Sequence, residues 1–357
     1  RFPSNHKILS LHYVTLQDDR VNIMKISILD TQDCEKVFFN KSLKNHQINY
    51  IQESADKIKA TDLAKIKDSE VLSSFVYSKM DAKFLKQFPK LKLIATRSTG
   101  FDHIDLTYCV KNKIAVATVP SYGENTVAEH SFALILSIAR RLVDYHRITD
   151  HNEYSSEHYK GFDLRGKTIG VIGAGNIGKN TIRIAKGFGM NVLAYDINHD
   201  IFLSETMGYE YKDLKTLMSK SDIICLNVPY NKFTHHLINL QNIKDIKKGA
   251  VLINVARGAV IETEALLFAL EKKIISAAGL DVLEEEENII KNHPHLTDKD
   301  KKNPVYQMNH KIINHPNVIF TPHIGFDTKE AVDRITQTTI ENIINFSKGT
   351  ASNLVKI

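Results

Sequence analysis

Cysteine is scarce in this sequence, with Cys34, Cys109 and Cys225 the only three among 357 residues. They are widely spaced inside apolar periodic segments, which favours buried free thiols over a disulfide framework. No apolar run approaches the roughly 18 residues that a membrane span needs, and the N-terminus lacks a basic segment followed by an apolar core and a cleavage site. We therefore expect a cytoplasmic protein without structural disulfides or membrane contact.

A concentrated basic face is also missing, because the net charge of +6 is spread along the chain. This argues against nucleic-acid binding and fits mild attraction for anionic small molecules. The length allows two domains of ordinary size. Residues 1–23 have no clear period and precede a clean strand that begins after Met24. We treat them as an N-terminal extension, either upstream of a natural start or left over from cloning, and assign them no function.

Short β-branched runs alternate with helical patterns from Met24 onward. This alternation predicts an α/β protein whose parallel sheets are covered by helices on both faces. In the first part of the chain, strands are expected within 25–30, 48–52, 71–77, 91–98 and 114–119, and helices within 34–44, 81–88 and 105–113.

A glycine-rich segment, 166–196, has the order strand, turn, helix, strand and acid. Gly173 permits a tight turn, Gly175 lets the backbone approach a pyrophosphate, and Gly178 lets the helix pack on the strand. The N-terminus of the helix then faces the phosphates with unpaired N–H groups. Asp196 would accept hydrogen bonds from the adenosine ribose and repel a 2′-phosphate, which favours NAD over NADP. The alternative is an ordinary glycine-rich βα turn, which is disfavoured because the strand, the helix and the acidic residue are all present at the expected positions.

A second series of elements surrounds this fingerprint. Thr126 and Glu129 form a capping box that predicts a helix from there to about Leu142. The helix is apolar nearly all round, so either a core position or a dimer contact explains it. Further strands are expected at 223–228, 251–255, 276–280 and 318–320, and a final helix, 328–346, is long enough to return to the first domain.

A polar stretch, 284–317, interrupts the pattern. We interpret it as an insertion with a turn or two of helix that could act as a flap over the cleft. His293, His295 and His310 could suggest a metal, but their spacing matches no known site, so a solvated loop is favoured and no metal is expected.

Polar side chains follow several strands directly. Arg257, Asp281 with the acidic run 284–287, His323, and the Val228–Pro229 pair all come after β-branched runs. Ligands of doubly wound sheets bind beyond the carboxyl ends of the strands, so this joint placement predicts one reactive site.

The motifs RSTGFDHID (97–105), VPSYGENTVAEH (119–130), GVIGAGNIG (170–178), NVARG (254–258), GLDVLEEEE (279–287) and TPHIG (321–325) resemble those of the D-isomer-specific 2-hydroxyacid dehydrogenases. The form of the first motif, Tyr122 and the long insertion are similar to the D-lactate dehydrogenase branch. The resemblance implies two doubly wound parallel-sheet domains. They are a flavodoxin-like substrate domain, 24–123 with 324–357, and a Rossmann NAD-binding domain, 124–323, through which the family forms homodimers.

The resemblance also implies residue roles. His323 matches the proton donor and acceptor, Arg257 the substrate-binding arginine and Glu286 the carboxylate partner of the histidine, in preference to the other glutamates of the run. Thr99 and Gly100 match backbone amides that hold the substrate carboxylate, and Tyr122 matches a tyrosine near the substrate. The cofactor set is Gly173, Gly175, Asn176, Ile177, Gly178, Asp196, Val228, Pro229, Ala256, Arg257, Asp281 and His323, with Asp281 at the nicotinamide carboxamide. Asn227 departs from the pattern, because many members have histidine there.

We therefore expect an NAD-dependent enzyme that reduces a 2-keto acid by hydride transfer, with pyruvate and D-lactate as the preferred pair. The alternatives within the class are hydroxypyruvate, glyoxylate or a branched-chain keto acid. An alternative from another class is a nucleotide-sensing scaffold similar to the corepressors that share this fold.

Overall fold

The structure is a computed structural model that describes residues 22–31, 33–76, 78–150, 160–286 and 302–356. The chain divides into two compact units. One comprises Arg1–Tyr122 and Asp333–Ile357, and the other comprises Gly123–Val332. The second unit extends beyond His323 to Val332, and the amides of Ile324 and Gly325 are hydrogen-bonded to Asp281 of the same unit.

The first unit contains a five-stranded sheet in the order β2-β1-β3-β4-β5, and every ladder in it is parallel. This is the flavodoxin-like strand order, as expected. The elements are β1 (Lys25–Ile28), α1 (Asp33–Ser42), β2 (Gln47–Tyr50), α2 (Ala60–Ile66), β3 (Val71–Ser74), α3 (Ala82–Leu85), β4 (Leu93–Thr96), α4 (Leu106–Lys111), β5 (Ala115–Ala117) and α14 (Lys329–Ser347).

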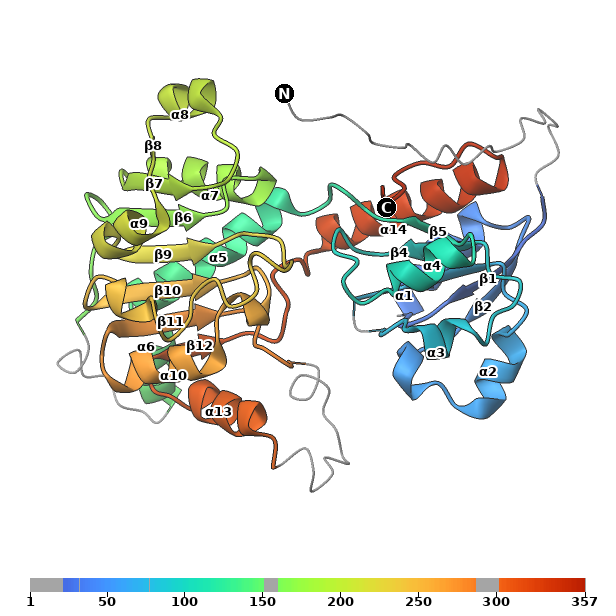
Figure 1. Ribbon diagram of the computed structural model, residues 1–357, viewed down its shortest axis with the longest axis horizontal. Coiled ribbons are helices and arrows are strands. Elements are labelled where there is room, and N and C mark those ends of the chain that lie inside the picture. Colours follow the sequence, from blue (N-terminus) through green and yellow to red (C-terminus); the bar gives the residue numbers. More distant parts are fainter. Residues whose placement is uncertain (1–21, 32, 77, 151–159, 287–301, 357) are drawn as a thin grey trace, which may run out of the picture. The chain divides into compact units, whose positions relative to one another are not determined.

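Helices flank the sheet of the first unit (Figure 1). Successive strand residues face two separate cores. Leu72 and Ile94 point to the side where α2, α3 and α4 pack, whereas Val71 and Leu93 point to the side of α1. The second core also contains Ile340 and Ile343 of α14. The C-terminal helix therefore belongs to the first unit, which its length permits and the family resemblance implies.

The second unit contains a seven-stranded parallel sheet in the order β12-β11-β10-β9-β6-β7-β8. The strand order reverses between β6 and β9, which is the switch point of a Rossmann sheet. The elements are α5 (Glu124–Ala139), α6 (Leu142–Asp150), β6 (Thr168–Ile172), α7 (Asn176–Gly187), β7 (Asn191–Tyr195), α8 (Ile201–Met207), β8 (Glu210–Tyr211), α9 (Leu214–Lys220), β9 (Ile223–Leu226), β10 (Ala250–Asn254), α10 (Thr263–Glu271), β11 (Ile275–Leu280), α13 (Pro304–Ile313) and β12 (Val318–Phe320).

Helix α5 is a core helix of the second unit. Phe132, Leu134, Ile135 and Ile138 are buried in one core with residues of α7 and of strands β6, β9 and β10. The opposite face of the sheet carries a second core formed with α9, α10 and α13. The packing of α5 inside its own unit accounts for its apolar sequence, and dimerisation through this unit stays a prediction.

The capping-box prediction is wrong. Helix α5 begins at Glu124, Gly123 is its N-cap, and no side chain caps it. Thr126 is buried inside the first turn, and Glu129 accepts a hydrogen bond from the Asn125 side chain at 3.1 Å. The helix starts earlier than expected because Glu124 and Asn125 continue the turn that Gly123 opens, so Thr126 is already helical.

The insertion contains more helix than expected. Helix α13 extends over ten residues, is capped by the Asn303 side chain, and buries Ile312 in the core beside α10. The flap and the His293–His295 pair lie outside the described residues. Of the cysteines, Cys109 and Cys225 are buried and free, and burial raises the pKa of each thiol to about 11. The side chain of Cys34 is not among those described.

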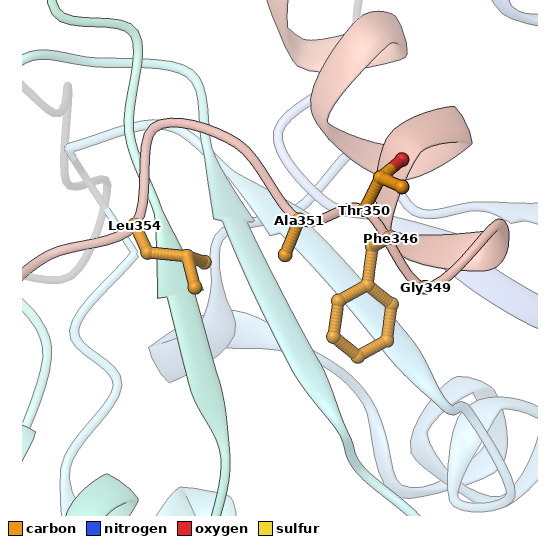
Figure 2. A pocket seen from close by; sticks show the side chains of 5 residues that line it. All are labelled: Phe346, Gly349, Thr350, Ala351 and Leu354. Atoms are coloured by element: carbon orange, nitrogen blue, oxygen red, sulfur yellow. The ribbon is translucent and has the colours of Figure 1, made fainter. Parts of the chain in front are cut away.

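A hollow of about 370 Å³ lies at the C-terminal end of α14 in the first unit (Figure 2). It is lined by Phe346, Gly349, Thr350, Ala351 and Leu354. No side chain in this set ionises, so it lacks the groups needed for acid–base chemistry. None of the helices in the described ranges has the length and apolar character that crossing a bilayer requires.

Candidate active site

The glycine-rich loop follows β6 at the switch point of the second unit. Gly173 has φ +95°, and a Cβ there would lie 2.8 Å from the backbone of Asn227. A Cβ on Gly178 would lie 1.9 Å from the Gly173 carbonyl oxygen, whereas a Cβ on Gly175 would meet nothing within 4 Å. Two glycines are therefore required by internal packing. The third opens onto space at the N-terminus of α7, where a phosphate could approach the backbone.

Asp196 lies directly after β7 and faces this loop. Its Oδ2 accepts a hydrogen bond from the Ala174 amide at 2.7 Å, and its Oδ1 accepts one from the Asn198 amide at 2.9 Å. The carboxylate therefore orders the glycine-rich loop from the neighbouring strand end. A carboxylate can accept further hydrogen bonds, so it can also meet ribose hydroxyls. Its role in cofactor choice stays a prediction.

Asp281 follows β11 and holds the loop that carries His323. Its Oδ1 accepts hydrogen bonds from the Thr321 hydroxyl at 2.6 Å and the Ile324 amide at 2.9 Å, and its Oδ2 accepts one from the Gly325 amide at 2.9 Å. Burial favours a raised pKa for this carboxyl, but the bonds from His130 and Thr321 and the attraction of His130 hold the pKa below its usual range. The expected contact of Asp281 with nicotinamide stays a prediction.

His323 and Glu286 form a close pair. The imidazole Nδ1 is 2.5 Å from Glu286 Oε1, and the two side chains are only 14% and 17% exposed. Glu286 Oε2 accepts a second hydrogen bond, from the Leu283 amide at 2.9 Å. The carboxylate is thus fixed through both oxygens, and it fixes the orientation of the ring. A hydrogen bond of this kind sets which ring nitrogen faces the carboxylate and how the imidazole is oriented.

The other described glutamates of the acidic run have different partners. Glu284 pairs with His236 at 2.8 Å and accepts a hydrogen bond from the Thr263 hydroxyl at 2.7 Å. Glu285 is exposed and accepts a bond from the Asn303 side chain at 2.6 Å. The structure therefore places Glu286, not Glu284 or Glu285, against the histidine, and Glu287 lies outside the described residues.

Arg257 lies at the end of β10, beside the acidic run. A Cβ on the next residue, Gly258, would lie 1.9 Å from the Leu283 backbone, so the two loops are in direct contact. The Arg257 guanidinium donates to the Ala256 carbonyl at 2.9 Å, and the Arg257 carbonyl accepts from the Asn254 side chain at 3.1 Å. The loops that carry Arg257, Glu286 and His323 thus follow three neighbouring parallel strands, β10, β11 and β12, at one edge of the sheet. That they form one reactive site stays a prediction.

The remaining predicted residues belong to the first unit. The Thr99 hydroxyl donates to the Val119 carbonyl at 2.7 Å, and the Gly100 carbonyl accepts from the Ser98 hydroxyl at 2.6 Å. The Tyr122 carbonyl accepts from Arg334 Nε of α14 at 2.6 Å. These bonds fix the loops after β4 and β5. Their role as substrate contacts stays a prediction.

His130, on α5, is a residue that the sequence analysis missed. Its Nε2 is 3.0 Å from Thr321 Oγ1 and 3.2 Å from Asp281 Oδ1. It ends the VPSYGENTVAEH segment, which was used only to identify the family. A histidine inside an otherwise apolar buried helix was the available signal, because such a side chain needs a polar partner.

Comparisons with known proteins agree with this geometry. Residues 132–325 match the family model described as D-isomer specific 2-hydroxyacid dehydrogenase, NAD binding domain. The chain is 34% identical over 331 residues to the D-lactate dehydrogenase of Escherichia coli, which covers 91% of this chain and 98% of that protein. It is 36% identical over 294 residues to the glyoxylate reductase of Thermococcus litoralis, covering 80% and 83%.

A solved structure is similar over nearly the whole chain. The D-lactate dehydrogenase from Aquifex aeolicus, crystallised with NAD and lactic acid, has a TM-score of 0.82 at 36% identity and covers 91% of this chain and 96% of its own. The chain therefore belongs to the D-isomer specific 2-hydroxyacid dehydrogenase family, as an NAD-dependent oxidoreductase. The predictions of family, fold class and cofactor are confirmed.

Proposed function

We propose that this enzyme reduces pyruvate to D-lactate, and that His323, Glu286 and Arg257 carry the reaction. The observation that supports it most is the 2.5 Å contact between His323 Nδ1 and Glu286 Oε1 at the carboxyl edge of the NAD-binding sheet. An imidazole held in this way is suited to exchange a proton with a carbonyl or alcohol oxygen.

The residues around the switch point fit a dinucleotide. The open side of Gly175 gives a pyrophosphate access to the backbone, and Asp196 already orders the loop beside it. We assign the cofactor to this loop, to Asn176 and Ile177 at the start of α7, and to Val228, Pro229 and Ala256 at the following strand ends. When bound there, NADH supplies the hydride.

His323 supplies the proton. Glu286 engages Nδ1, so we assign proton transfer to Nε2. As the substrate carbonyl carbon accepts hydride, negative charge grows on its oxygen and the imidazolium proton moves to it. In the oxidation direction, the neutral imidazole accepts the hydroxyl proton instead. Glu286 stabilises the positive charge that the ring carries in one of these two states.

Arg257 binds the substrate in this proposal. A guanidinium offers fixed, planar donors that match a carboxylate or a developing oxyanion, which a lysine ammonium would match less well. The contact between Gly258 and Leu283 holds its backbone beside the loop that carries Glu286. The bond from its guanidinium to the Ala256 carbonyl restricts the conformation of the side chain.

Glyoxylate is the second candidate substrate, because the relative from Thermococcus litoralis is a glyoxylate reductase at a similar level of identity. Pyruvate is preferred because the match to the D-lactate dehydrogenase of Escherichia coli extends over more of both chains. The two substrates differ by one methyl group, which is worth only about 1–3 kcal/mol in an apolar pocket.

The test is NADH oxidation with pyruvate, glyoxylate, hydroxypyruvate and branched-chain 2-keto acids, followed by chiral analysis of the product. We expect the highest kcat/KM with pyruvate and a D product. In His323→Gln, reduction should fall by about 10²–10⁴-fold while NADH affinity, measured by fluorescence titration, is retained. A higher kcat/KM with another keto acid would refute pyruvate as the preferred substrate. An L product, or a His323→Gln variant with wild-type turnover, would refute the mechanism. No turnover with any of these acids would refute the activity.

A further inference from the structure

His130 connects α5 to the loop that carries the proposed proton donor. Its Nε2 lies 3.0 Å from Thr321 Oγ1 and 3.2 Å from Asp281 Oδ1, while the Thr321 hydroxyl donates to that same Asp281 oxygen at 2.6 Å. Three polar atoms from three distant segments thus meet at one point. The Asp281 side chain is 3% exposed and that of His130 is 17% exposed.

The position of the proton in this cluster follows from the number of donors. A threonine hydroxyl has a single proton, and here it is given to the Asp281 carboxylate. Thr321 Oγ1 must therefore accept at His130, and Nε2 must carry a hydrogen. The opposite tautomer would place a nitrogen lone pair against a carboxylate oxygen. Nε2–H is the arrangement in which all three groups are satisfied.

The cluster supports a strained piece of backbone. His323 has φ +55°, a left-handed conformation that non-glycine residues rarely adopt and that persists when its surroundings hold it. The amides of Ile324 and Gly325, which follow it directly, are bonded to the two oxygens of Asp281. The His323 amide itself donates to the Asp281 carbonyl at 2.8 Å.

We propose that His130 is a positioning residue of the enzyme: by donating from Nε2 to Thr321 Oγ1, whose own proton goes to Asp281, it fixes the Asp281 carboxylate, and through it the loop that aims His323 at the substrate. The inference rests on the function proposed above. Helix α5 is suited to this task because its apolar face is buried against α7 and the sheet, so His130 is held by a rigid element.

The lowered pKa of Asp281 is consistent with this arrangement, because a carboxylate that accepts several hydrogen bonds stays ionised. Gly325 adds a steric reason for close coupling. A Cβ there would lie 2.8 Å from Asp281 Oδ2 and 3.3 Å from the ring of His130. The loop therefore packs directly against both groups, and a displacement of either one is transmitted to it.

The first test does not depend on activity. Long-range ¹H–¹⁵N NMR on protein labelled at histidine reports which ring nitrogen carries hydrogen, and His130→Phe identifies the signal of His130. We expect a protonated Nε2 on His130, and we expect His130→Phe to shift the ring signals of His323. An unprotonated Nε2, or unchanged His323 signals, would overturn the proposal.

The second test separates donation from volume. His130→Phe retains a ring without a donor, whereas His130→Gln places an amide N–H near the Nε2 position. Because small displacements of a reacting group are costly, kcat for keto-acid reduction should fall by about 10- to 100-fold in His130→Phe, with NADH affinity retained, and His130→Gln should recover most of the loss. Thr321→Val should reduce kcat in the same way. Because both residues act through the same hydrogen bond, kcat of the double variant His130→Phe/Thr321→Val should be no lower than that of either single variant.

His310→Phe is the matched control, because His310 is exposed on α13 and its side chain contacts Tyr306 of the same helix and the C-cap residue Asn314. Its kcat should equal that of the wild type. If the wild type is active and His130→Phe keeps full kcat, the positioning role is refuted and the proposed function stands. If no keto acid is reduced, the proposed function fails, and the NMR measurement still decides whether His130 is the donor to the loop.

Discussion

Glu286→Gln tests the central pair of the proposed mechanism with a change of one atom. In the wild type, Oε1 accepts from His323 Nδ1 at 2.5 Å and Oε2 accepts from the Leu283 amide at 2.9 Å. A glutamine has one oxygen and one NH₂ group, so it cannot accept at both places. If its oxygen still accepts from His323, its NH₂ group faces the Leu283 amide, so that two hydrogen-bond donors meet. If it stays on Leu283, the NH₂ group faces Nδ1 and forces the hydrogen onto Nε2.

The size of the effect follows from the bond that is lost. Hydrogen bonds to charged groups contribute about 1.5–3 kcal/mol, and the pair is mostly buried, so solvent screening removes little of this. With about 1.4 kcal/mol for each factor of ten in rate, kcat should fall by about 10- to 150-fold. Both directions should be affected, because reduction loses the charge that stabilises the imidazolium, and oxidation loses the tautomer that accepts a proton.

The assay is steady-state kinetics with NADH and the preferred 2-keto acid, and with NAD and the corresponding hydroxy acid, alongside NADH binding by fluorescence. The matched control is Glu285→Gln, the same substitution one residue away, where the side chain is exposed and bonded to Asn303. It should keep wild-type kcat. A Glu286→Gln enzyme with wild-type kcat in both directions would refute the pairing argument, and equal losses in both variants would attribute the effect to the loop in general.

Two further predictions concern carboxylates of the second unit. Asp196→Ala should narrow the preference for NADH over NADPH and weaken NADH binding, because the Ala174 amide loses its acceptor; an unchanged ratio of kcat/KM would contradict the role of Asp196. The second concerns Asp222. Burial favours a raised pKa for its carboxyl, but the hydrogen bonds that it accepts from Lys247 and Thr168 hold the pKa below its usual range. Its contribution to stability is therefore present above about pH 4 and is lost as the pH falls through the folded-state pKa. Asp222→Asn should therefore lower the free energy of unfolding at pH 7, with the difference from wild type closing in acid; urea titrations that show a constant difference would be evidence against this linkage.

The glycine-rich loop was predictable because its constraints are local. Gly173, Gly175 and Gly178 lie within one turn and the start of one helix, so their spacing alone carries the geometry. The strand ends were predictable for a related reason, since parallel strands bring their carboxyl ends to one edge of the sheet. The strand pattern alone does not distinguish Glu286 from the other glutamates of the acidic run. The choice of Glu286 came from the family resemblance.

Other features depend on contacts that no local pattern encodes. The start of α5 was misjudged because Thr126 and Glu129 satisfy the capping pattern while Gly123, three residues earlier, opens the helix. Helix α13 was underestimated because residues 284–317 are polar overall, whereas Ile312 is buried in the core beside α10 and Ile313 packs against it. His130 lies 191 residues before Thr321 in the sequence, and only the fold brings them together.

The left-handed backbone of His323 connects these long-range contacts to the chemistry. Such a conformation costs of order 1–3 kcal/mol at a residue with a side chain, so the loop would relax unless other groups held it. The Asp281 carboxylate accepts hydrogen bonds from the amides of Ile324 and Gly325, and Glu286 holds the imidazole ring of His323 through Nδ1. The backbone and the ring of His323 are thus held by two different carboxylates. Changes at Asp281 or His130 should therefore displace the histidine, whereas changes at Glu286 should alter its proton, and the two effects can be separated by comparing the kinetics with the NMR signals of the ring.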